Sequence, residues 1–261
     1  MDLYLTLAGL LPALVLCVYI YIKDRTEKEP ILLLIQLLAA GVAIIWPISI
    51  VEGALLDLFE GNAVLENFLG IALVEEGFKL IAVLVLTKKS EEFNSIFDGI
   101  VYATFVSLGF AAVENVLYVT HYGWINAAMR AVMSVPAHTF FGIMMGYYYS
   151  FWAILDRVAA KERILKEKGL VKKSVPEYSS VRFVVASVLV PVFLHGLYDY
   201  CCTSSSMVAL VVFVVLLIVM YIYCFGKVRK MSKIDAPVNN YVFALLAKKY
   251  PELKAYIYNN L

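Results

Sequence analysis

Charge is scarce in this 261-residue chain: Asp, Glu, Lys and Arg together make up 16% of it, against about 25% in soluble domains. Hydrophobic residues make up 62%, and the mean hydropathy is +0.80. This balance excludes an ordinary soluble globular protein and predicts a chain that crosses a membrane several times. The net charge of +1 gives no indication of a nucleic-acid partner.

Several familiar catalytic motifs are also absent. The sequence has no H-E-x-x-H, the usual helix-borne zinc motif, and no G-x-S-x-G serine elbow. It shows no internal repeat and no low-complexity linker. The few cysteines lie in or at the ends of apolar runs without metal-ligand spacing, which predicts free thiols: Cys17, Cys201, Cys202 and Cys224.

Long apolar runs predict an all-α membrane protein, a bundle of about seven transmembrane helices. The runs cover residues 3–22, 31–50, 63–86, 96–119, 125–155, 181–201 and 207–225. An acidic connection at 52–62, a loop at 120–124 and a long basic loop at 156–180 lie between them. We expect one transmembrane domain over 1–225, with a catalytic core in 63–201. Residues 226–261 would form a cytosolic tail, with an amphipathic part on the membrane surface.

Basic residues predict the orientation of these helices. The connections after the first, third and fifth runs carry Lys and Arg, as does the tail, whereas the alternate connections carry none. Every connection therefore favours an N-terminus outside and a C-terminus in the cytosol.

The third run carries three ionisable residues near its middle: Glu75, Glu76 and Lys79. Each charged group at such depth costs roughly 2.5–3.5 kcal/mol. Helical spacing places Lys79 one turn from Glu75 on the same face, while Glu76 points about 100° away. We therefore expect these groups to have a function.

Three further apolar runs carry polar groups at comparable depth. His138 and Glu75 lie roughly 18–20 Å from the outer ends of their helices, and Glu114 and His195 roughly 7–9 Å from theirs. Pro136 and Pro191, a few residues before the two histidines, free backbone carbonyls of the kind that line cavities. These features predict a water-filled cavity that opens outward.

Each pair of polar groups also has a structural interpretation, such as an intrahelical salt bridge between Glu75 and Lys79. A structural role for all of them together is the less favoured interpretation. His121 and Arg130 lie near the outer surface, and we assign neither of them a role.

Carboxylates and histidines without a suitably flanked serine or cysteine favour water as the nucleophile. Two routes are open at this point. A glutamate acts as general base while histidines polarise the carbonyl and protonate the leaving group. Alternatively, two histidines and a carboxylate hold a zinc ion while another glutamate is the base.

Four motifs on successive runs resemble those of the PrsW family of intramembrane proteases, relatives of the CAAX prenyl endopeptidases and bacteriocin-immunity proteases. They are Glu75-Glu76-x-x-Lys79, Phe110-x-x-x-Glu114, His138-x-x-x-Gly142 and His195-x-x-x-Asp199. The resemblance covers about half of the chain. It implies a multi-pass protein of the bacterial cytoplasmic membrane that hydrolyses a peptide bond in a membrane-anchored protein, near its extracytoplasmic side. The implied substrate is a single-span anti-sigma factor, cut at site 1 in a stress response.

The resemblance also implies roles for individual residues. Glu75 or Glu76 is the base, and His138 helps to activate water or binds metal. His195 and Asp199 stabilise the oxyanion or complete a metal site, for which the candidate ligands are Glu114, His138, His195 and Asp199. Lys79, Glu114, Asn115 and Phe110 are expected to support the site. Glu114 stands where the prenyl-endopeptidase branch has histidine, which argues against a prenylated substrate.

Two other classes of protein compete with the protease. A proton- or ion-coupled transporter predicts polar groups that reach both faces and repeat symmetry, and the sequence shows neither. A non-catalytic immunity or scaffold protein on the same fold predicts the loss of site residues, yet all four motifs are intact.

Overall fold

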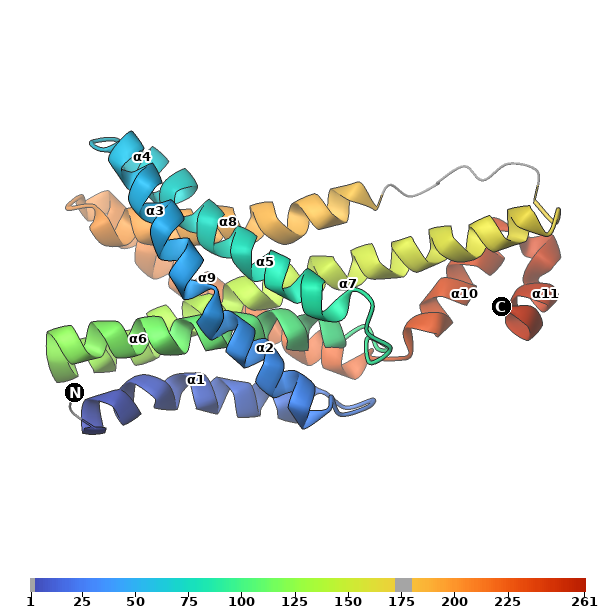
Figure 1. Ribbon diagram of the computed structural model, residues 1–261, viewed down its shortest axis with the longest axis horizontal. Helices are drawn as coiled ribbons and strands as arrows, with labels where there is room; N and C mark the ends of the chain where they lie inside the picture. The colour runs from blue at the N-terminus through green and yellow to red at the C-terminus, as the bar shows by residue number, and fades with distance from the viewer. Residues whose placement is uncertain (1–2, 172–179) are drawn as a thin grey trace.

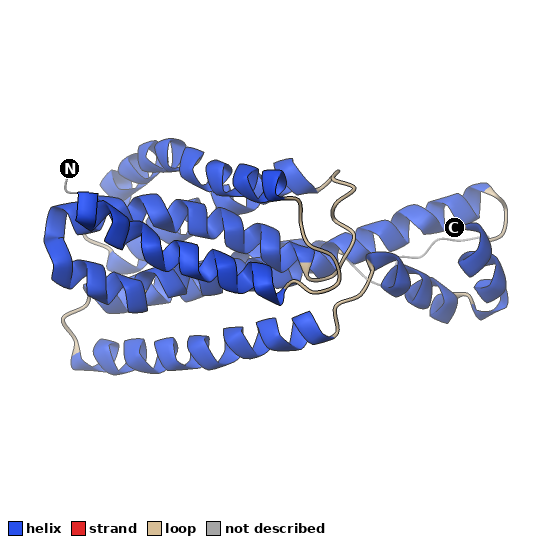
Figure 2. Ribbon diagram, turned by 90° about the horizontal axis from the view of Figure 1, so that it is seen from below, coloured by secondary structure: helices blue, strands red, loops and turns tan. Residues whose placement is uncertain are grey.

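The computed structural model describes residues 3–171 and 180–261, and nearly all of these residues lie in helices (Figures 1 and 2). The first seven elements in chain order are α1 Leu3–Lys23, α2 Ile31–Ala43, α3 Ile45–Phe59, α4 Ala63–Leu65, the π-helix η1 Glu66–Ala72, α5 Leu73–Thr87 and α6 Asp98–Val132. They are followed by α7 Ser134–Glu167, α8 Val181–Thr203, α9 Met207–Lys233, α10 Val238–Lys249, the 3₁₀ turn η2 Pro251–Leu253 and α11 Lys254–Asn260.

Among the described residues, five helical stretches are long and apolar enough to cross a membrane: Leu3–Lys23, Ile31–Phe59, Asp98–Glu167, Val181–Thr203 and Met207–Lys233. The Asp98–Glu167 stretch has 70 residues and reverses direction, so it supplies two antiparallel helices. The third predicted run is present but divided among α4, η1 and α5. The predicted all-α membrane bundle is confirmed, and its helices are compatible with seven crossings. The orientation of the termini stays a prediction.

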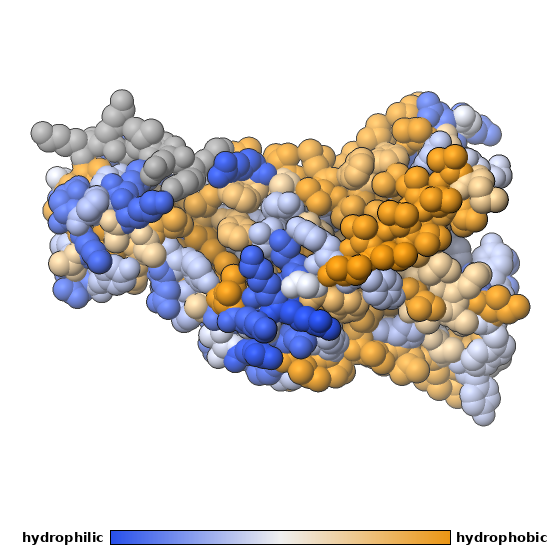
Figure 3. Space-filling view, turned by 180° about the vertical axis from the view of Figure 1, so that it is seen from behind, coloured by the Kyte–Doolittle hydropathy of each residue, from blue (hydrophilic) through white to orange (hydrophobic). Residues whose placement is uncertain are grey.

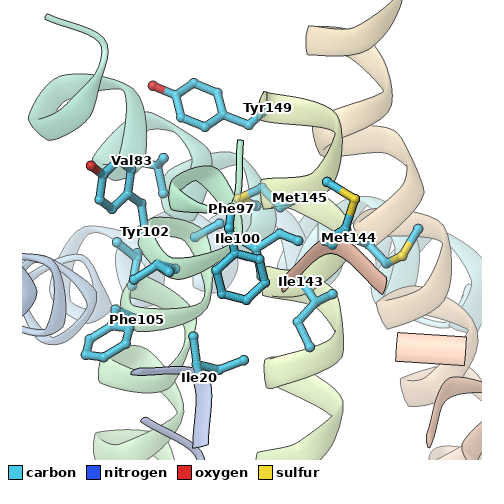
Figure 4. Close-up of a cluster of buried hydrophobic side chains, with 14 of the residues drawn as sticks. Ile20, Val83, Phe97, Ile100, Tyr102, Phe105, Ile143, Met144, Met145 and Tyr149 are labelled. Atoms are coloured by element: carbon cyan, nitrogen blue, oxygen red, sulfur yellow. The ribbon is translucent and has the colours of Figure 1, made fainter. Parts of the chain in front are cut away.

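Helices α6 and α7 form the centre of the bundle, with α1 and α2 packed on α6 and α8 packed on α7. Figure 4 shows side chains from both central helices meeting in the buried core, among them Ile100, Phe105 and Ile143. Gly146 makes the close approach of α6 and α7 feasible, because a Cβ there would lie 2.1 Å from the carbonyl oxygen of Gly99. The central pair is therefore packed backbone to backbone.

The second apolar run is longer than its sequence suggests. Helices α2 and α3 together span Ile31–Phe59, so most of the predicted 52–62 connection is helical, which corrects that prediction. The break between them at Ile44 has a local cause, because Pro47 has no N–H for the carbonyl of Ala43. Glu52 therefore lies within α3 and not in a loop.

The turn at Gly123, within α6, is also shorter than the predicted loop at 120–124. The chain is helical on both sides of Gly123, whose φ of 78° breaks the helix. The chain must reverse there, since the Glu114 carboxylate bonds His138, 24 residues away, and a straight helix would separate them by about 36 Å. Glycine adopts such a positive φ without a steric penalty.

The basic segment at 156–180 was predicted to be a loop, and this is wrong for its first part. Helix α7 continues to Glu167, with Val158 and Leu165 buried. Helix α10 of the tail packs against this extension, and its Val242 and Leu246 belong to the same core. These apolar contacts are what make the segment helical. Residues 172–179 lie outside the described part of the chain.

The tail begins later than predicted, because α9 continues past residue 225 to Lys233. Figure 1 shows α10 and α11 beyond one end of the bundle, beside the end of α7. Figure 3 shows apolar residues spread over the bundle, with hydrophilic residues concentrated toward the end that carries the tail. The membrane-surface position of the tail stays a prediction.

Candidate active site

Helix α5 holds the predicted glutamates and lysine in one buried ion-pair group. The Lys79 Nζ lies 2.9 Å from Glu75 Oε2 and 2.8 Å from Glu76 Oε1. The Lys79 and Glu76 side chains are fully buried, and that of Glu75 is 8% exposed. The ammonium group also lies 4.1 Å from the centre of the Phe110 ring, a cation–π contact. Glu75 is therefore the member of the group nearest to open space.

Histidine His138 of α7 joins this group to α6. Its Nδ1 lies 3.3 Å from Lys79 Nζ, and its Nε2 lies 2.8 Å from Glu114 Oε2. Arg130 pairs with the same Glu114 oxygen at 2.9 Å, and its Nε donates to Asn115 Oδ1 at 2.8 Å. A guanidinium group thus fixes the carboxylate that in turn fixes the imidazole.

Histidine His195 of α8 closes the group on the opposite side. Its Nδ1 lies 3.0 Å from Glu76 Oε1 and 3.9 Å from Glu75 Oε2, while its Nε2 lies 3.2 Å from Asp199 Oδ2. Phe141 of α7 stacks on the ring, with centroids 4.7 Å apart. Stacking and hydrogen bonds on both nitrogens leave the His195 ring little rotational freedom.

The two histidines are held in the same way. Each directs Nε2 to an outer carboxylate, Glu114 or Asp199, and Nδ1 inward to the group on α5. Because a carboxylate only accepts, each Nε2 carries a proton, and Nδ1 of His195 carries one toward Glu76 as well unless a metal ion takes its place. Histidines that bind metal ions characteristically donate their second N–H to such a carboxylate.

The inward-facing atoms form a set that suits a metal ion. One ligand atom from each of Glu75, Glu76, His138 and His195 lies within 4.8 Å of the others, and all four residues are buried. Two imidazole nitrogens and two carboxylate oxygens are ligands that zinc accepts. Glu76 Oε2 is buried without a hydrogen-bond partner, so a ligating atom is left free. The donors fit zinc, with the Lys79 ammonium as the competing cation.

This quartet differs from the one expected from the sequence. Both contain the two histidines, but the structure places Glu114 and Asp199 behind them, on the outer nitrogens. The sequence could not distinguish the two sets, because which ring nitrogen faces inward depends on the relative rotation of the helices.

A cavity of about 850 Å³ opens onto the group, a volume typical of ligand pockets. Its charged and titratable lining residues include Glu52, Glu75, Glu114, Arg130, His138, His195 and Asp199. Apolar residues of α3 and α9 complete the wall, among them Ile48 and Phe213. The predicted side chains thus converge on one cavity rather than on separate helix contacts.

The π-helix η1 sets the direction in which the glutamates point. The Leu73 N–H bonds the carbonyl of Phe68, five residues back, so the turn holds an extra residue. The Phe68 ring covers Gly196 of α8, where a Cβ would lie 2.6 Å from it. The extra residue allows η1 to pack on α8 while Glu76 still reaches His195.

The proline near the start of α7 has a visible consequence. Pro136 cannot donate to the carbonyl of Val132, one turn earlier. That carbonyl instead accepts a hydrogen bond from the Tyr221 hydroxyl of α9, at 2.6 Å. The freed backbone group is satisfied by a neighbouring helix, as membrane proteins require.

The sequence of this site matches a known family. The model of the PrsW family intramembrane metalloproteases matches residues 29–224, three quarters of the chain. The chain belongs to the PrsW family. It is an intramembrane protease of the bacterial cell membrane, built from several membrane-spanning helices.

Curated members of the PrsW family support the assignment. The Protease PrsW of Oceanobacillus iheyensis is 36% identical over 231 residues, which cover 87% of this chain and 97% of the relative. Those of Geobacillus kaustophilus and Bacillus subtilis are 35% and 31% identical, covering 74% and 76% of this chain and 77% and 83% of the relatives. No solved structure matches the chain significantly.

Two charged residues that line the cavity of this PrsW-family protein were not identified from the sequence. Arg130 was assigned no role, yet it pairs with Glu114 and lies over the Tyr118 ring. Glu52 was placed in the acidic connection at 52–62, yet it lines the cavity from α3. The reversal at Gly123 is the signal that could have found Arg130, since it returns that residue to the level of Glu114. His121 is exposed, as predicted.

Proposed function

We propose that this protein hydrolyses a peptide bond of a single-span membrane protein near its extracytoplasmic side, with water activated by a glutamate. An anti-sigma factor cut at site 1 is the proposed substrate. The single observation that supports this most is the convergence of Glu75, Glu76, His138 and His195, from α5, α7 and α8, in one buried group that reaches a cavity through Glu75 and the two histidines.

The geometry favours different roles for the two glutamates. Glu75 lines the cavity, so its carboxylate can accept a proton from a water molecule beside the scissile carbonyl. Glu76 is fully buried and bonds both Lys79 and His195, so it positions these two groups. We therefore propose Glu75 as the general base.

The imidazole groups act on the substrate carbonyl, and Glu75 acts on the leaving amine. His138 and His195 both line the cavity, where their imidazole groups stabilise the developing oxyanion electrostatically. Glu114 and Asp199 hold the two rings in orientation through their Nε2 atoms. A proton taken up by Glu75 then passes to the leaving nitrogen as the C–N bond breaks.

A zinc ion in this site would be held by Glu75, Glu76, His138 and His195. Bound there, it would supply Lewis acidity to the carbonyl and to water. Its presence is testable independently of activity, because the metal content of the purified protein should fall when His138 and His195 are both replaced by alanine. Unchanged cleavage after exhaustive chelation, with no metal in the protein, would eliminate the zinc route.

The decisive experiment replaces site residues and follows a tagged single-span substrate in bacterial membranes. Glu75→Ala, Glu76→Ala and His138→Ala should each abolish cleavage while the protein still accumulates. Glu76→Gln should retain part of the activity, because its amide oxygen still accepts from Lys79 and His195, whereas Glu75→Gln should retain none. Glu60→Ala, an exposed glutamate outside the cavity lining, is the matched control. Full cleavage by all three alanine variants would refute the proposal.

A further inference from the structure

One carboxylate of the cavity takes no part in the mechanism above. Glu52 of α3 lines the cavity, and its Oε1 is buried without a hydrogen-bond partner. The other lining carboxylates all have partners: Glu75 pairs with Lys79, Glu114 with Arg130, and Asp199 with His195. Among the described residues, Glu52 makes no hydrogen bond and no ion pair.

The charge of the cavity wall is unbalanced in the same direction. Four carboxylates line it, those of Glu52, Glu75, Glu114 and Asp199, against the single guanidinium group of Arg130. Arg130 is already engaged by Glu114 and Asn115. Glu52 lies within electrostatic range of Glu75 and Glu114 as well as of His195 and Lys79, and the acidic groups of the wall still outnumber its basic ones. Such a wall attracts a cation and repels an anion.

The surroundings of Glu52 suit a long cationic side chain. Ile48 and Leu56 lie one turn before and one turn after it on α3, and both line the cavity. The methylene stem of a lysine or arginine can pack along such an apolar face while its charged head reaches a carboxylate. Glu52, Glu75 and His195 line the same cavity, so a substrate cation at Glu52 would lie in the cavity where the peptide bond is cut.

We propose that Glu52 is a specificity-determining residue that binds a lysine or arginine side chain of the substrate next to the scissile bond. This rests on the proposed protease function of the same cavity. The contact forms when substrate enters, because the carboxylate has no partner beforehand. A charge-assisted hydrogen bond of this type is worth about one order of magnitude in selectivity.

The test uses purified protein and synthetic single-span peptides whose outer flank carries Lys, Ala or Glu at the positions around the cut. The readout is kcat/KM for each peptide, with cleavage sites mapped by mass spectrometry. The wild-type protein should prefer Lys over Ala by about tenfold. Glu52→Gln should cleave both peptides at similar rates, and Glu52→Lys should prefer the Glu peptide.

The control is Asp57→Asn, which removes the same charge from an exposed position of the same helix, and it should keep the wild-type preference. Equal cleavage of the Lys and Ala peptides by the wild-type protein would overturn the specificity proposal and leave the protease intact. An unchanged preference in Glu52→Gln would also overturn it. No cleavage of any peptide by the wild-type protein would instead overturn the proposed function, and this inference with it.

Discussion

Two groups of buried carboxylates differ in how their charge is neutralised. In the active site, Glu75, Glu76 and Glu114 each pair with a lysine or arginine. At the other end of the bundle, Asp24 and Glu29 follow α1 and are 0% and 4% exposed. No Lys or Arg side chain pairs with either of them among the described residues.

Hydroxyl and backbone groups surround the second cluster instead. The Tyr102 hydroxyl donates to Glu29, and the N–H groups of Asn94 and Ser95 donate to Asp98. Lys28 bonds backbone carbonyls, including that of Asp24, and not the carboxylates. Both oxygens of the Asp24 carboxylate are buried without a hydrogen-bond partner. The active site thus pairs its carboxylates with fixed cations, whereas the second cluster has hydroxyl and backbone partners in place of a cation.

The sharpest way to break the active-site arrangement is Lys79→Met. It leaves the Glu75 and Glu76 carboxylates without the cation that they share, and breaking a buried ion pair costs about 3–5 kcal/mol. We expect cleavage to be lost and the thermal midpoint to fall strongly. Combining it with Glu76→Gln should restore much of the stability but no activity. If Lys79→Met alone had wild-type stability, Lys79 would not be the cation that neutralises the two glutamates.

Arg130→Gln tests the second cation of the site. Loss of the guanidinium group frees Glu114, which then orients His138 less well, so kcat should fall by roughly 10–100-fold with a smaller change in KM. Arg130→Lys should recover part of kcat, because the ammonium still pairs with Glu114. The exposed His121→Gln is the control. An unchanged kcat in Arg130→Gln would remove Arg130 from the site.

The second cluster should respond to pH. Burial raises the pKa of Asp24 from 3.8 to about 6 and that of Glu29 from 4.5 to about 7. The folded protein therefore binds more protons than the unfolded chain between about pH 4 and 7, and its stability falls as the pH rises through this window.

Asp24→Asn and Glu29→Gln should flatten that dependence and raise the thermal midpoint at neutral pH. Nearby Lys28, Asp98 and Asp235 are unchanged in both variants. Melting curves measured across this pH range would show the change, with the exposed Glu27→Gln of the same loop as the control. An equally steep loss of stability in all of these variants would mean that other groups titrate.

The smallest expected effect is that of Tyr221→Phe. It removes only the hydroxyl that bonds the Val132 carbonyl freed by Pro136, at a cost of about 0.5–1.5 kcal/mol for a typical hydrogen bond. We expect a modest decrease in thermal midpoint with cleavage retained. A decrease as large as that of Lys79→Met would place this bond among the principal supports of α7.

The apolar runs and the charges within them were sufficient to predict the helical bundle and the meeting of four motifs. Intrahelical spacing predicted the pairing of Lys79 with Glu75, and that of His195 with Asp199 follows the same i, i+4 rule. The position of Glu52 was not predictable in this way, because its helix continues beyond the point where the apolar pattern ends. The second cluster was missed because Asp24 and Glu29 lie in a polar segment, whose burial depends on contacts with α6.

The number of residues in the π-helix η1 determines how far α5 is rotated about its own axis. One residue fewer between Glu66 and Ala72 would turn that segment into a regular α-helix and rotate its two ends by about 100° relative to each other. Phe68 could then remain over Gly196, or Glu76 could remain at His195, but not both. The extra residue of η1 therefore determines which direction the catalytic glutamates of α5 face, although it precedes them in the chain.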